Sequence, residues 1–181
     1  KSLEVDFDEN IATLLYTGIM TDTGSFNYSN ANSDTFRVVA DLLDNGAKAV
    51  EVCKKLNDTM KEAKLKLIAK TVDNMEVYYD GKMRYSYVSY QEIQELGLGD
   101  EDAEGMTNYL RAVEGTEVAV YVRGKSDGSL KVSMRSGGKV DTSKIAIAFG
   151  GGGHPRAAGY TMKESLEIEK EKLIKAVGEM L

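Results

Sequence analysis

The stretch Gly150-Gly151-Gly152-Gly153-His154-Pro155-Arg156-Ala157-Ala158-Gly159 is the most distinctive part of this 181-residue sequence. It holds four consecutive glycines, the only histidine and the only proline. Ordering a glycine costs roughly 0.5 to 1 kcal/mol more than ordering an alanine, so a plain connection would seldom use four. Backbone amides left bare by such a loop can point at phosphate oxygens, and His154 and Arg156 add donors. The alternative is structural: the glycines let strand and helix pack tightly, with His154 hydrogen-bonded in the core.

The charge along the chain is uneven. The net charge is −6, yet the segment from Arg123 to Arg156 contains seven basic and only two acidic residues. A basic segment in an acidic chain favours a localised anion site, although a solvated basic face would give the same composition.

Other bulk features narrow the class of protein. No apolar run approaches the roughly 20 residues of a membrane span, so no membrane partner is expected. The single cysteine, Cys53, excludes an internal disulfide and falls in an apolar helical stripe, which predicts a buried structural thiol and fits a cytoplasmic protein.

The first third of the chain has helical periodicity. Residues 11–20 form one apolar stripe that runs into the polar turn Thr21-Asp22-Thr23-Gly24. A second helix should begin after Asn32 or Ser33 and end at Asn45-Gly46, and a third should cover 47–56. The second helix is expected to bury a face made of Phe36, Val39, Ala40 and Leu43. Residues 60–68 are apolar on one side only and look like a connecting helix.

From Met75 onward the pattern becomes that of a mixed α/β domain. Residues 77–79 and 83–88 flank Asp80-Gly81 as a hairpin, and Ser89 to Glu92 is a capping box that begins a helix. Residues 117–122 and 130–134 should form a second hairpin, with helices near 106–113, after Asp141 or Thr142, and at the C-terminus, and a strand at 157–160. The sequence thus predicts an α/β protein: a helical part over 1–58, a linker helix over 59–73 and a mixed-sheet domain over 74–181.

Three motifs now support a family resemblance. Gly150 to Gly159 resembles the GGGHxxAAG signature of the DHHA1 domain, and Val132-Ser133-Met134-Arg135-Ser136 resembles the strand that ends in Arg-Ser. Upstream, Tyr16 to Phe26 is similar to the last conserved motif of the DHH phosphoesterase domain. The motifs occur in the family's order and span essentially the whole chain. The chain therefore resembles the C-terminal part of a DHH/DHHA1 phosphoesterase of the nanoRNase type, which acts as an oligoribonuclease and 3′-phosphoadenosine 5′-phosphate phosphatase.

The resemblance implies a metal-dependent phosphoesterase in which two Mn²⁺ ions stabilise the attacking and leaving oxygens. It makes Asp22 a metal ligand, whereas an isolated Thr-Asp-Thr-Gly would more often be a turn. The family's Asp-His-His motif cannot occur here, because His154 is the only histidine. We therefore expect a truncated chain that holds neither ion and hydrolyses nothing by itself, with one domain gripping the substrate and the other, when complete, cleaving it.

The resemblance also assigns the substrate contacts. These are Arg135, Ser136, the amides of Gly151, Gly152 and Gly153, and His154; Arg156 occupies a variable position of the signature. Asn108 and Arg111 match a helical region that approaches substrate, although a solvated helix face fits them equally well. The implied partners are short single-stranded RNA or DNA, or a nucleotide phosphate, with a homodimer also compatible. The alternatives are a non-catalytic nucleotide-binding or nucleic-acid-binding module, and the tail domain of alanyl-tRNA synthetases, which lacks Thr-Asp-Thr-Gly.

Overall fold

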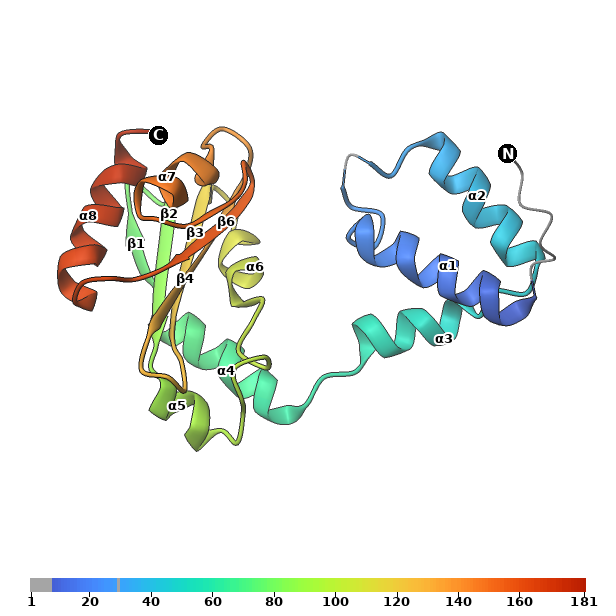
Figure 1. The fold of residues 1–181 in the computed structure, drawn as a ribbon, viewed down its shortest axis with the longest axis horizontal. Coiled ribbons are helices and arrows are strands. Elements are labelled where there is room, and N and C mark those ends of the chain that lie inside the picture. Colours follow the sequence, from blue (N-terminus) through green and yellow to red (C-terminus); the bar gives the residue numbers. More distant parts are fainter. Residues whose placement is uncertain (1–7, 29) are drawn as a thin grey trace. The chain divides into compact units, whose positions relative to one another are not determined.

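The computed structural model describes residues 8–28 and 30–181, which divide between Met60 and Lys61 into two compact units. The first unit is helical, with α1 over Glu9–Asp22, α2 over Ser33–Asp44 and α3 over Ala49–Cys53, which continues as a π-helical turn over Lys54–Asp58 (Figure 1). Asn32 caps α2 as predicted: its side chain accepts from the amides of Asp34 and Thr35. Local capping chemistry therefore sets this boundary.

The core of the first unit differs in two details from the sequence expectation. Its buried apolar residues are Ala12, Tyr16, Met20, Val39, Leu42 and Val52. On α2 the buried line runs through Val39 and Leu42, while Phe36, Ala40 and Leu43 are exposed, so the predicted face was only partly correct. The helix buries one narrow line, and Phe36, Ala40 and Leu43 form the neighbouring line around the helix, which stays in solvent.

The prediction of a buried thiol at Cys53 was also only partly correct, because the side chain packs against this core but is only half-buried. α3 ends at this residue, and Val52 is the helix position that faces the core. The Cys53 sulfur lies 3.6 Å from the Tyr16 hydroxyl and 3.8 Å from the Met20 sulfur.

The second unit is built on one six-stranded sheet in the order β1-β2-β3-β4-β6-β5. The strands are β1 Glu76–Tyr78, β2 Met83–Val88, β3 Val118–Gly124, β4 Leu130–Ser136, β5 Gly152–His154 and β6 Ala157–Thr161. Both predicted hairpins form, since β1 pairs with β2 and β3 pairs with β4 in antiparallel fashion. Only β2 and β3 are parallel, joined by a crossover that holds α5 (Tyr90–Glu95) and α6 (Met106–Arg111). The α/β class is confirmed.

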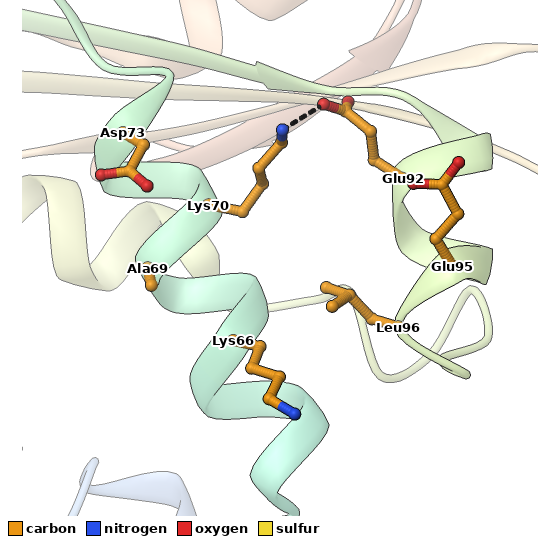
Figure 2. Close-up of a pocket in the computed structure, with 7 residues that line it drawn as sticks. All are labelled: Lys66, Ala69, Lys70, Asp73, Glu92, Glu95 and Leu96. Atoms are coloured by element: carbon orange, nitrogen blue, oxygen red, sulfur yellow. Dashed lines mark ion pairs between the residues drawn. The ribbon is translucent and has the colours of Figure 1, made fainter.

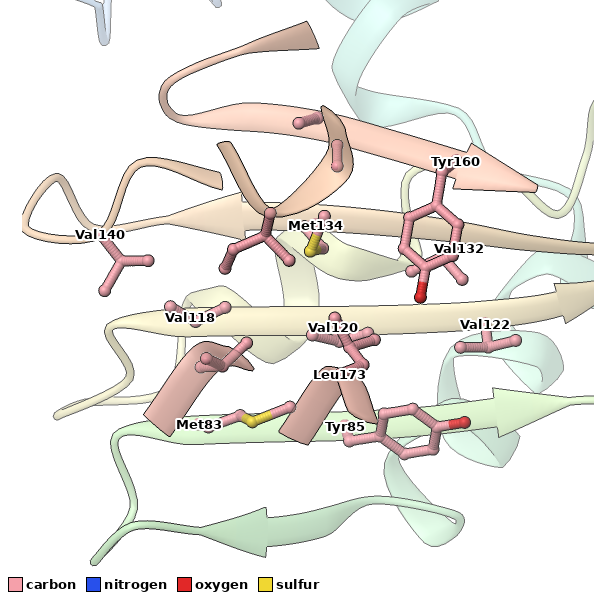
Figure 3. Close-up of a cluster of buried hydrophobic side chains, with 14 of the residues drawn as sticks. Met83, Tyr85, Val118, Val120, Val122, Val132, Met134, Val140, Tyr160 and Leu173 are labelled. Carbon is pink, nitrogen blue, oxygen red and sulfur yellow. The ribbon is translucent and has the colours of Figure 1, made fainter. Parts of the chain in front are cut away.

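Helices cover both faces of this sheet. On one face α7 (Thr142–Ala148) and α8 (Leu166–Gly178) pack over a core in which Val118, Val120 and Val122 line the central strand (Figure 3). On the other face α4 (Glu62–Asp73), α5 and α6 bury residues such as Leu67, Ile93, Met106 and Leu110 against Ala119 and Tyr121. Strand residues alternate between the two cores, as a two-sided sheet requires.

The helix α4 falls within the predicted linker region of 59–73. Its Leu67 has no exposed surface and packs beside Ile93 and Leu110, so this helix is part of the second unit's core. The assignment of residues 1–58 to a catalytic domain stays a prediction. Within the residues described, no helix combines the length and the hydropathy that crossing a membrane requires.

One strand was not predicted. Within the glycine stretch, Gly152–His154 forms β5, an edge strand that pairs with β6 across the two-residue turn Pro155-Arg156. Glycine has low strand propensity, and consecutive glycines show no alternation of apolar and polar residues, so no strand could be predicted there. Sheet pairing with β6 overrides that propensity.

Candidate functional site

Arg135 and His154 lie in one row of the sheet. Both are paired with Ala157 of β6, Arg135 from β4 on one side and His154 from β5 on the other. Residues directly opposite each other in neighbouring strands project from the same face, and two strand spacings separate the outer Cα atoms by roughly 10 Å. His154 is exposed, and its ring makes no hydrogen bond or ion pair in the described part of the chain. The alternative of a core histidine is therefore wrong.

The row faces the side of the sheet on which α6 packs. Ala119 is the β3 partner of Arg135, and it lies in the core formed with Met106 and Leu110 of α6. Asn108 on the same helix is exposed and has no side-chain partner within the described residues. Arg111 is half-buried and donates to the Thr116 carbonyl at 3.2 Å. The structure thus brings α6 to the sheet face that carries Arg135 and His154.

The glycines of the stretch 150–153 differ in their surroundings: some pack closely against neighbouring backbone, and one borders open surface. The Gly151 amide donates to the Ala146 carbonyl at 2.7 Å, which closes the end of α7, so this amide is already engaged. Gly153 has a φ of +142°, and a Cβ there would lie 2.5 Å from the Ala157 carbonyl oxygen. Gly152 is different, since a Cβ there would meet nothing within 4 Å. A Cβ at Gly151, like one at Gly153, would clash with β6, here with the Gly159 carbonyl. Tight packing against β6 therefore explains Gly151 and Gly153, and Gly152 leaves open sheet surface beside His154.

Ser136 points toward the opposite core and is buried. Its hydroxyl donates to Glu117 Oε1 at 3.1 Å, and the same oxygen accepts from the amides of Gly138, Lys139 and Val140. Burial raises the pKa of Glu117, but these amide and hydroxyl hydrogen bonds outweigh it and leave the pKa below its usual value. The predicted contact Ser136 is therefore occupied by a carboxylate of the chain itself.

Glu117 was missed by the sequence reasoning. It is an unremarkable acidic residue before a strand, and its partners lie 19 to 23 positions away. No short motif connects the two segments, so no signal in a single sequence could have identified it.

Arg156 lies in the turn between β5 and β6, one residue from the row. Its guanidinium lies against Gly138, 3.1 Å from the position that a Cβ would take. The side chain is exposed and forms no hydrogen bond or ion pair within residues 8–28 and 30–181. Arg156 thus brings a guanidinium close to the row, at the tip of the hairpin, without a hydrogen-bond or ion-pair partner among the described residues.

Asp22 belongs to the first unit and ends α1. It is exposed, and its Oδ2 accepts from Asn30 Nδ2 at 3.0 Å. The turn that follows is left-handed at three successive residues, Gly24, Ser25 and Phe26, with φ of 56°, 56° and 65°. Positive φ at non-glycine residues is strained, and such strain often occurs at functional sites.

The donor set around Asp22 does not match a two-ion site. Among the described residues no group of three or more His, Cys, Asp or Glu side chains is placed to hold a metal. One carboxylate cannot supply the ligands of two divalent ions. The described residues therefore do not fit the metal pair that the family resemblance implies.

A surface hollow of about 320 Å³ lies between α4 and α5, away from the predicted contacts (Figure 2). Lys70 forms an ion pair with Glu92 across it, with Nζ 2.8 Å from Oε1; the dashed line in Figure 2 marks this pair. Partial burial raises the pKa of Glu92, but the hydrogen bonds from Lys70 and from the Ser89 amide leave that pKa below its usual value. The hollow is bridged by an ion pair and contains none of the predicted site residues.

Comparisons with known proteins agree with the motifs. Residues 80–181 match the family model described as "DHHA1 domain". The chain is 34% identical over 181 residues to the bifunctional oligoribonuclease and PAP phosphatase NrnA of Thermus thermophilus, covering 99% of this chain and 53% of that protein. It is 28% identical to the probable bifunctional oligoribonuclease and PAP phosphatase NrnA of Streptococcus mutans, covering 93% of this chain and 54% of that one.

A solved structure is also similar. The exopolyphosphatase-related protein of Bacteroides fragilis superposes with a TM-score of 0.85 at 27% identity, covering 93% of this chain and 51% of that chain. The chain thus spans about half the length of these relatives.

Proposed function

The chain belongs to the DHHA1 domain family, and from that premise we propose that its second unit grips the phosphate of a short nucleic acid or nucleotide. The substrate class is short single-stranded RNA or DNA, or a nucleoside 3′,5′-bisphosphate. The whole protein would be a phosphoesterase that hydrolyses such molecules, in line with its homology to the NrnA proteins.

The row Arg135-Ala157-His154 carries this proposal. Arg135 supplies a planar, permanently charged fork that suits phosphate oxygens, and His154 supplies a second donor across the row. Ala157 and Gly152 keep the surface between and beside them low. A phosphate would therefore have donors from two strands and no bulky side chain in its way.

The contacts predict weak sequence preference. Phosphate and sugar contacts fix the position of a nucleic acid but read no base edges. Asn108 on α6 and Arg156 at the hairpin tip would add contacts at the margins of the row. We expect affinity to depend on the terminal phosphate more than on the base.

This chain by itself is proposed to bind without hydrolysing. Asp22 alone cannot hold two Mn²⁺ ions, and the described residues supply no further ligand cluster. In a polypeptide that carries an Asp-His-His motif ahead of this sequence, Asp22→Asn should suppress Mn²⁺-dependent release of mononucleotides. Undiminished turnover there would remove Asp22 from the metal site.

The binding proposal is tested by titrating a 5′-phosphorylated RNA dinucleotide against the chain and against Arg135→Ala and His154→Ala. Loss of either donor, the Arg135 guanidinium or the His154 ring, should weaken binding by roughly 1.5 to 3 kcal/mol, or about 10- to 150-fold in Kd. Lys144→Gln, an exposed lysine on α7, serves as a control for general charge. Equal affinity in all four proteins would rule out the proposed site.

The second candidate is a non-catalytic nucleotide-binding module. It is favoured by one observation: among the described residues no group of three or more His, Cys, Asp or Glu side chains is placed to hold a metal. Both candidates share the Arg135 and His154 row, so binding does not separate them. Presence of an Asp-His-His motif in the same polypeptide, together with Mn²⁺-dependent hydrolysis, would eliminate the module.

A further inference from the structure

We propose that Glu117 is a positioning residue of the proposed binding face: it fixes the turn from Ser136 to Val140, which directly follows Arg135 in the chain and against which the Arg156 guanidinium lies. This inference rests on the proposed function. It goes beyond the motif residues, because Glu117 belongs to none of the three motifs that carry the family resemblance.

Glu117 accepts from four of the five backbone N–H groups of this turn, those of Gly137, Gly138, Lys139 and Val140. The Gly137 amide donates to the Glu117 carbonyl at 2.7 Å. The amides of Gly138, Lys139 and Val140 donate to Glu117 Oε1 at 3.1, 2.6 and 3.0 Å. Consecutive backbone N–H groups that point to one place form a concavity that binds anions. Here the anion is the Glu117 carboxylate of the protein itself.

The turn is attached to two of the proposed contacts, Arg135 and Arg156. Ser136 follows Arg135 directly on β4, and its amide donates to the Arg156 carbonyl at 3.1 Å. The Arg156 guanidinium lies over Gly138. If the turn loses its anchor, the end of β4 and the Pro155-Arg156 hairpin lose the contacts that set their relative position.

The turn also has little room to adjust. A side chain at Gly137 would meet Glu117 Oε2 at 2.7 Å, and one at Gly138 would meet the Arg156 guanidinium at 3.1 Å. The absence of a side chain lets the Glu117 carboxylate approach the backbone at Gly137 and the Arg156 guanidinium approach it at Gly138. The turn therefore depends on Glu117 for its shape, since it has no side chains of its own at these two positions.

Whether neutralising Glu117 weakens or tightens phosphate binding distinguishes a positioning role from a purely electrostatic one. Glu117 carries a negative charge close to a site proposed for an anion, so neutralising it would tighten phosphate binding if charge were its only contribution. If Glu117 positions the turn, neutralising it weakens binding instead. Salt suppresses the first effect and leaves the second, because the Debye length falls to about 3 Å at 1 M ionic strength.

The experiment measures Kd for adenosine 3′,5′-bisphosphate and for a 5′-phosphorylated RNA dinucleotide with wild type, Glu117→Gln and Glu117→Ala. Gln keeps an acceptor oxygen, so its loss should be smaller than that of Ala, which we expect to reach about tenfold, the equivalent of roughly 1.4 kcal/mol. The matched control is Glu92→Gln. Glu92 also accepts from a backbone amide and a serine hydroxyl, both of Ser89 at 2.8 Å, but it lies on α5.

The outcomes are distinct. A graded loss at Glu117 with unchanged affinity in Glu92→Gln supports positioning. Tighter or unchanged binding in Glu117→Gln overturns it while the proposed function stands, and equal losses at Glu117 and Glu92 reduce it to a general stability effect. Failure of the wild type to bind either ligand overturns the proposed function itself.

A spectroscopic readout covers the case in which Glu117→Ala does not fold. In the wild-type protein the amide resonances of Lys139 and Val140 should follow the titration of Glu117, and ligand should perturb them together with Arg135. Amide resonances that ignore both the titration and the ligand would contradict the proposal.

Discussion

Arg135 and His154 are separated by a single small residue, since both pair with Ala157 in one row across β4, β6 and β5. They are 19 positions apart in the sequence, and only the pairing of the glycine-rich edge strand brings them together. The edge strand is therefore part of the proposed binding face and more than a connection, because it sets how far apart the two donors lie.

The first prediction concerns the residue between them. Ala157→Val should weaken binding of a 5′-phosphorylated dinucleotide about tenfold, because a branched side chain would stand between the two donors. Valine suits a strand, so the unfolding free energy should change by only about 0.5 kcal/mol. Thr161→Val, on the same strand and face but paired with Lys131, is the matched control for binding by titration calorimetry. Equal affinity in Ala157→Val and wild type would show that phosphate does not cross this row.

The second prediction compares two adjacent glycines. Gly153→Ala should destabilise the second unit by roughly 1 to 3 kcal/mol, because φ is +142° and the new Cβ would lie 2.5 Å from the Ala157 carbonyl and the Ala158 Cα. Gly152→Ala should change stability by less than about 1 kcal/mol, since its Cβ would meet nothing within 4 Å. Urea unfolding of both variants tests the difference. Similar losses would mean that the strand pairing around β5 is not as described.

Much of the fold could be predicted from local sequence. The Asp80-Gly81 hairpin and the Ser89 to Glu92 capping box depend on residues a few positions apart, and both form as predicted. The parallel pairing of β2 with β3 could not be predicted in this way, because it joins segments separated by two helices. Local chemistry determines turns and caps, whereas strand order depends on which faces become buried together.

The candidate site likewise has parts that local sequence predicts and parts that depend on long-range pairing. The glycine stretch and Arg135 are recognisable in the sequence, but their placement in one row with His154 depends on the unpredicted strand β5. Glu117 could not be predicted from the sequence at all. The four hydrogen bonds of its carboxylate to the turn connect distant segments without any motif, so only the folded structure reveals them.

The third prediction tests the role of α4. Leu67→Ala should cost about 2 to 5 kcal/mol of unfolding free energy, because this side chain has no exposed surface and packs beside Ile93 and Leu110. Leu65→Ala, two residues earlier on the same helix, has a side chain that is 61% exposed and should change stability by no more than about 0.5 kcal/mol. Denaturant titrations of the two variants provide the comparison. Equal, small effects would mean that α4 is a free connector.

The last prediction is a pH dependence at Glu92. Its pKa in the folded chain lies below the ordinary value: burial raises it, but the hydrogen bonds from Lys70 and Ser89 lower it by more. At pH values between the two pKa values of Glu92, the unfolded state binds more protons than the folded state. The interactions of the Glu92 carboxylate therefore stabilise the fold fully above the unfolded pKa of about 4.3, and this stabilisation is lost as pH falls through the folded pKa. Glu92→Gln should therefore lower the unfolding free energy at pH 7 by about 0.5 to 1 kcal/mol, a modest amount because Lys70 is partly exposed.

Glu95→Gln provides the matched control for this pH dependence. Glu95 is an exposed carboxylate on the same helix, with no ion pair within the described residues, and Figure 2 shows it beside Glu92. The gap between wild type and Glu92→Gln should close as pH is lowered below 4, whereas Glu95→Gln should track wild type throughout. Added salt should remove the Lys70 part of the gap and leave the Ser89 cap, since charge pairs near the surface are screened and a neutral donor is not. A gap that persists unchanged at low pH would mean that Glu92 stabilises the helix through packing rather than through its charge.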